Sequence, residues 1–209
     1  MDRALQAFEQ QRMRDPAYTD IPYFLGLVHI WRGEAFARLK NNGAALEEYR
    51  KGATSFETVA QATVGNLTRC DLAASYNKIA GALIAAGNDT EARASYFKAL
   101  RIAEPLALKT PPSVLALYVV ADAYAGMGTL AGRSRLAPGA ASSAQQPLFE
   151  ERCAWLQKST EAWQKIPNPS RISPSSYGTQ GFEVAGPELV RKQLRGCERM
   201  SPKVLPQLP

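Results

Sequence analysis

The chain has 209 residues, 45% of them hydrophobic and 21% charged, which is the balance of an ordinary folded protein and not of a disordered one. It contains no apolar run of the ~18 residues that would suggest a membrane span, and its charged N-terminus lacks the apolar centre of a secretory signal. We therefore expect a soluble chain that does not bind membranes and is cytoplasmic as given, its compartment being open if it is a fragment of a larger protein.

The net charge of +6 comes mostly from the part of the chain after residue 130. The basic residues are scattered singly, and no nucleic-acid-binding module is recognisable. A solvated basic face is therefore favoured over a nucleic-acid-binding surface.

The sequence lacks a constellation of catalytic or metal-binding residues. The three cysteines, Cys70, Cys153 and Cys197, are far apart, and the single His29 cannot complete a zinc site with them. We interpret the cysteines as small apolar helix residues in a reducing setting, and His29 as a partly buried structural residue. The sequence thus predicts no catalytic residue, no metal site and no cofactor.

Helices account for almost all of the elements predicted along the chain. Residues 2–13 suit one short helix, which Asp15 and Pro16 end. Three helical hairpins follow at about 23–62, 67–107 and 112–166, then a capping helix at about 186–200 and a tail at 201–209. Within the third hairpin, residues 129–147 are rich in Ala, Gly, Ser and Pro, and we expect them to form an exposed, mobile insertion. The first 200 residues read as a single domain.

The middle hairpin, residues 72–102, is the clearest of the three. Apolar residues recur at helical spacing on both sides of Gly87, which is the residue type that ends helices in the left-handed conformation. Asn88 and Glu91 have the spacing of a capping box, which opens the next helix. The stretch therefore predicts two helices joined by one tight turn.

The residue pattern of this hairpin resembles the tetratricopeptide repeat. The matching positions are Tyr76, Ile79, Ala80, Leu83, Gly87, Ala92, Tyr96, Ala99 and Pro105. A shift of 47 positions, which places Gly33 on Ala80, repeats the pattern in the first hairpin. A shift of 41 positions, which places Leu117 on Tyr76, repeats its first helix in the third. The residues expected to pack the repeats together are Phe36, Ala45, Tyr49, Tyr76, Ala92, Tyr96, Ala99 and Tyr124.

The resemblance implies an all-α fold, a right-handed α-solenoid of about three hairpins with flanking and capping helices. The alternative is an ordinary helical hairpin within a bundle. Because both spacings exceed the ~34 residues of the basic repeat, longer second helices are expected. In such arrays the first helix of each hairpin lines a concave groove. The groove-lining residues would then be Glu34, Arg38, Asn77, Lys78, Tyr118 and Asp122, although each could equally be a solvated polar residue.

Short motifs give a second resemblance, over about residues 24–200. DLAASY, SYFKAL, a tryptophan-bearing helix and GFEV resemble the C-terminal tetratricopeptide region of bacterial eukaryotic-like serine/threonine protein kinases. This resemblance implies a signalling appendage that senses or docks, without the phosphate loop and catalytic motifs of the kinase itself. We expect a non-catalytic scaffold that binds a protein or peptide. The alternatives are a regulatory module that packs on its neighbouring domain or on a second copy through Trp155 and Trp163, and an unrecognised all-helical enzyme.

Overall fold

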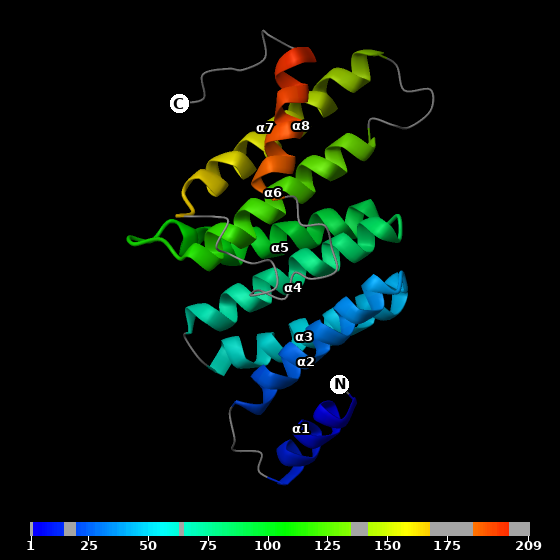
Figure 1. Ribbon diagram of the computed structural model, residues 1–209, viewed down its shortest axis with the longest axis vertical. Coiled ribbons are helices and arrows are strands. Elements are labelled where there is room, and N and C mark those ends of the chain that lie inside the picture. The colour runs from blue at the N-terminus through cyan, green and yellow to red at the C-terminus, as the bar shows by residue number, and fades with distance from the viewer. Residues whose placement is uncertain (1, 15–19, 63–64, 135–141, 168–185, 201–209) are drawn as a thin grey trace.

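The computed structural model describes residues 2–14, 20–62, 65–134, 142–167 and 186–200, and all regular structure in these ranges is helical. Figure 1 shows the helices stacked along the long axis of the molecule, with α1 near one end and α8 near the other. The elements are α1 (Asp2–Arg14), α2 (Ile21–Arg38), α3 (Asn42–Ala62), α4 (Asn66–Ala85), α5 (Asp89–Ala107), α6 (Val114–Ser134), α7 (Ser142–Gln164) and α8 (Pro187–Met200). The expected all-α class is therefore confirmed.

Helices that follow one another in the chain also pack together. The pairs α2 with α3, α4 with α5 and α6 with α7 form the most extensive contacts, and α3 with α4 and α5 with α6 join one pair to the next. The first helices of successive pairs meet as well, because α4 contacts α6 directly and α2 more lightly. The side chains of α2, α4 and α6 can therefore form a continuous surface.

The turns of the first two hairpins have the same hydrogen bonds. Lys40 and Gly87 both lie in the left-handed region, at φ of 59° and 80°. In each turn the following asparagine, Asn41 or Asn88, donates its backbone N–H to a carbonyl five residues earlier, and its side chain accepts from a backbone N–H three residues later. This arrangement satisfies both helix ends. It also repeats at the same 47-position shift as the sequence pattern.

Small residues allow these helices to approach closely. At Gly33 of α2, a Cβ atom would lie 2.6 Å from the ring of Tyr49 in α3, and at Gly126 of α6 it would overlap the ring of Tyr96 in α5. The repeat-packing residues Ala45, Tyr49, Ala92, Tyr96 and Ala99 are all buried, whereas Phe36, Tyr76 and Tyr124 are half-buried against the same core. Tyr96 of α5 therefore packs closely against α6.

The third hairpin differs from its expected form. The predicted insertion at 129–147 is largely helical, since α6 continues to Ser134 and α7 already begins at Ser142, and residues 135–141 lie outside the described part. Leu130 and Ala131 are buried, which explains why α6 does not stop at residue 128. Over residues 114–133, α6 is long and apolar enough to cross a membrane, but 67% of it is buried inside the protein, as in the core helix of a soluble domain.

The interpretation of the cysteines as reduced residues is wrong for two of the three. Cys153 of α7 and Cys197 of α8 form a disulfide that joins these helices, and only Cys70 is free and buried. Helical periodicity places a cysteine on an inward face but does not identify the element that lies opposite, so the pairing was not visible in the sequence. The tail at 201–209 and residues 168–185 lie outside the described part.

Candidate functional site

Polar side chains of α2, α4 and α6 meet where these first helices touch. Lys78 of α4 donates from Nζ to Glu34 Oε1 of α2 at 2.7 Å. Both residues have only 5% of their surface exposed. Nζ of Lys78 also lies 5.9 Å from the centre of the Tyr49 ring. Burying either charge without the other would be costly, so the two side chains are held together.

Asn77 connects the same helix to α6. Its Nδ2 donates to the backbone oxygen of Val119 and to Asp122 Oδ2, both at 2.9 Å. Its Oδ1 is buried and has no hydrogen-bond partner among the described residues. Together with the Glu34–Lys78 pair, these contacts form a polar network that runs from α2 through α4 to α6.

Burial dominates the electrostatics of this network. It raises the pKa of Glu34 and lowers that of Lys78, although each attracts the other's charged form. Burial also raises the pKa of Asp122 to about 6, against the opposing effects of Lys78 and Asn77. Asp122 therefore changes charge close to neutral pH.

The expected groove-lining residues are thus close together, but most of them contact one another and not solvent. Glu34, Asn77 and Lys78 belong to the network, as does the less buried Asp122. Tyr118 is 3% exposed and packs edge-to-face on the Trp163 ring, with ring centres 5.2 Å apart, so it belongs to the core. Arg38 is exposed at the end of α2 and contributes positive charge near Glu34 and Lys78.

Trp31 is a surface residue of this region that the sequence analysis did not single out. It precedes Glu34 by three positions and Arg38 by seven, so it lies on the same face of α2. Its side chain is 48% exposed, although tryptophan is on average highly buried in folded proteins. Two features of the sequence could have indicated Trp31 as a contact residue. It has helical spacing to the expected groove residues Glu34 and Arg38, and aromatic residues are common at binding surfaces.

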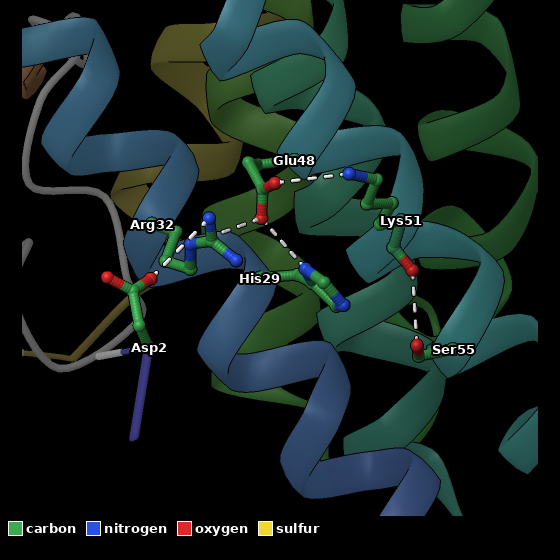
Figure 2. Close-up of polar contacts among 6 residues, drawn as sticks. All are labelled: Asp2, His29, Arg32, Glu48, Lys51 and Ser55. Atoms are coloured by element: carbon green, nitrogen blue, oxygen red, sulfur yellow. Dashed lines mark hydrogen bonds and ion pairs between the residues drawn. The ribbon is translucent and has the colours of Figure 1, made fainter. Parts of the chain in front are cut away.

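A second cluster of charges surrounds Glu48 of α3, as Figure 2 shows. His29 Nδ1 lies 2.8 Å from Glu48 Oε2, Arg32 Nε lies 3.7 Å from the same oxygen, and Lys51 Nζ lies 3.3 Å from Oε1. Burial alone would raise the pKa of Glu48, but the hydrogen bond of His29 and the charge of Arg32 outweigh it and lower the pKa. The carboxylate is therefore held ionised as an anchor between α2 and α3.

This arrangement agrees with the structural role expected for His29. Its ring is largely buried and paired with a carboxylate that Arg32 and Lys51 also contact. Nucleophilic catalysis would require a serine, cysteine or threonine hydrogen-bonded to this ring, and the contacts described around His29 include none. The described residues also contain no group of three or more metal-ligating side chains.

The face of α7 that carries Trp155 and Trp163 packs on α6. Trp163 is buried against Tyr118, and the hydroxyl of Ser159 donates to the backbone oxygen of Ala121 at 2.6 Å. Trp155 is half-buried and stacks on Tyr124. Trp155, Ser159 and Trp163, which are four positions apart, therefore form the contact of α7 with α6.

No protein-family model matches the chain, and no curated protein matches it.

Proposed function

We propose that this chain is a tetratricopeptide-like helical-repeat scaffold that binds a protein or peptide segment across α2, α4 and α6. The observation that carries the proposal is that the second hairpin repeats the first at a shift of 47 positions, in its turn hydrogen bonds and in its buried residues Ala92 and Tyr96, which correspond to Ala45 and Tyr49. Repeated hairpins of this kind stack into arrays whose first helices share one extended surface, which is the surface that such arrays use for binding.

The buried network gives this surface a fixed geometry. The Glu34–Lys78 pair ties α2 to α4, and Asn77 ties α4 to α6. A rigid surface binds with a smaller loss of conformational entropy than a mobile one. In this proposal the network sets the spacing of the helices and does not itself contact the partner.

Contact with the partner falls instead to the exposed residues beside the network. Trp31 and Arg38 are the two largest of these on α2, one aromatic and one cationic. Tryptophan and arginine are the residue types most enriched among those that dominate binding energy at protein interfaces. We infer that the partner presents an apolar side chain to Trp31 and an acidic or carbonyl group to Arg38.

Peptides selected from a random library for binding to the whole chain test this proposal. Trp31→Ala should weaken the selected peptides at least tenfold, equivalent to about 1.4 kcal/mol. Phe97→Ala is the matched control, because Phe97 is exposed to nearly the same extent, 47% against 48%, but lies on α5, the second helix of its hairpin. Equal losses in the two variants, or a larger loss in the control, would place binding elsewhere on the protein.

The resemblance to kinase-associated repeats supports a more specific version, in which the scaffold is the docking or sensing appendage of a signalling kinase. It rests on the short motifs in the sequence alone. Reading the DNA upstream of this segment tests it directly. A kinase catalytic domain in the same reading frame is the expected result, and an in-frame stop codon immediately upstream would contradict it.

A further inference from the structure

Among the described residues, the last helix, α8, is held mainly by one neighbour. It packs on α7 through buried Val190 and half-buried Leu194, and its last turn carries Cys197, which is bonded to Cys153. Figure 1 shows α8 lying across α7 at one end of the stack. A 14-residue helix is only marginally stable by itself in water, so α8 depends on this packing and on the disulfide to stay folded in place.

The disulfide lies at the wall of a surface cavity. Cys197 lines a hollow of about 300 Å³ between α7 and α8, whose other walls include Phe149, Leu189, Arg152 and Lys192. Two cationic side chains therefore flank the space from which a small molecule would reach the Cys197 sulfur. Positive charge at such a site attracts anionic thiols and stabilises the thiolate form that exchanges with disulfides.

We propose that Cys153–Cys197 is a thiol-exchange site that takes a small anionic thiol and acts as a releasable latch on α8. The thiolate of the small molecule bonds to Cys197 Sγ, the bond between the two cysteines breaks, and the electron pair leaves on Cys153 Sγ, which takes a proton from water. A second thiolate then removes the first as a small-molecule disulfide, and both cysteines are left as thiols. The protein is reduced by two electrons, and two small thiols are oxidised.

Reduction then frees α8 while the rest of the array stays folded. The helices α2 to α6 form contacts with one another that do not include α8, and the buried network and the repeated hairpins lie entirely among them. Release of α8 uncovers the side of α7 that carries Phe149, which is 5% exposed when α8 is docked. The latch would thus control the accessibility of an apolar surface at one end of the scaffold.

The test uses the whole chain, with glutathione as the anionic thiol and 2-mercaptoethanol as a neutral one, and follows disulfide cleavage by mass spectrometry under native conditions. Loss of one positive charge near the cavity should slow reduction by glutathione about threefold, so Lys192→Gln should show this change. Reduction by 2-mercaptoethanol, which also attacks as a thiolate but carries one negative charge fewer than glutathione, should slow less in the same variant. Equal effects on both thiols would overturn the recognition of an anionic thiol.

Amide hydrogen exchange on the same samples tests the latch. After full reduction, amides of α8 should exchange at rates close to those of an unfolded peptide, while those of α4 and α5 keep their protection. Cys197→Ser should reproduce the result without any thiol, and Cys70→Ser is the control, since Cys70 is buried away from α8. Retained protection of α8 after reduction, cleavage only on global unfolding, or absence of the disulfide from the oxidised protein would each overturn the proposal.

Discussion

Replacing Lys78 by methionine should destabilise the protein strongly at neutral pH and much less at acidic pH. Lys78→Met keeps the long unbranched side chain but leaves the carboxylate of Glu34 buried without the ammonium that lies 2.7 Å away. Removing one partner from a buried ion pair typically costs about 3–5 kcal/mol. The whole stability of a domain is about 5–15 kcal/mol, so this single change should be easy to measure.

Protonation of Glu34 limits this loss. Bringing a carboxyl with an ordinary pKa of 4.5 into its neutral form at pH 7 costs about 3 kcal/mol, at 1.36 kcal/mol per pH unit. The cost should therefore fall by about 1.4 kcal/mol for each unit of pH between 7 and 5. Glu34→Leu combined with Lys78→Met removes both charges and should restore most of the stability.

Urea unfolding followed by circular dichroism at pH 7, 6 and 5 provides the measurement for the wild type, the single variant and the double variant. A neutral effect of Lys78→Met at pH 7 would contradict the burial of this ion pair. A loss of stability that does not change with pH, or that Glu34→Leu fails to recover, would contradict it as well. Any of these results would mean that the pair is solvated in solution.

Three further predictions concern single positions. Burial raises the pKa of Asp122 in the folded state to about 6, from an ordinary value of 3.8. Between these two pH values the folded state binds more protons than the unfolded state, so the stability that Asp122 contributes falls as the pH rises. Asp122→Asn should remove this pH dependence from the free energy of unfolding, measured with urea between pH 4.5 and 7.5. Gly126→Ala places a methyl group on the ring of Tyr96 and should cost about 1–3 kcal/mol in thermal unfolding, and an unchanged melting temperature would show that these helices do not approach so closely. Lys40 and Gly87 both have positive φ, a conformation that glycine adopts more easily than other residues. Lys40→Gly should therefore stabilise the protein by about 1 kcal/mol, and Gly87→Ala should destabilise it by about as much. Changes of the same sign in calorimetry would contradict the turn geometry.

Elements whose residues satisfy local rules could be predicted from the sequence. The middle hairpin is the clearest case: Gly87 ends one helix and Asn88 caps the next in the structure, as their residue types indicate. The first hairpin was found by its match to this one, although Lys40 occupies the position of Gly87 and by itself gives no turn signal. Helix ends set by tertiary packing were harder to place, and Leu130 shows why, since its burial extends α6 into a stretch with no apolar period.

Contacts between side chains on different helices could not be predicted from the sequence. Register placed Lys78 and Glu34 on the expected groove faces, but whether they contact solvent or one another depends on the distance between α2 and α4, which no local pattern encodes. The same holds for Cys153 and Cys197, which lie on helices separated by a long connection. The solvent exposure of Trp31 could not be predicted either, because an exposed tryptophan and a buried one give the same apolar signal in a helical pattern.

The proposed function requires that α2, α4 and α6 together form a binding surface. Mapping amide chemical-shift changes when a selected peptide is added to the isotopically labelled protein tests this claim directly. We expect the largest changes to cluster on α2 around Trp31 and Arg38 and to extend to the facing residues of α4 and α6. Changes confined to the second helices α3 and α5, or to the α7–α8 end, would contradict it.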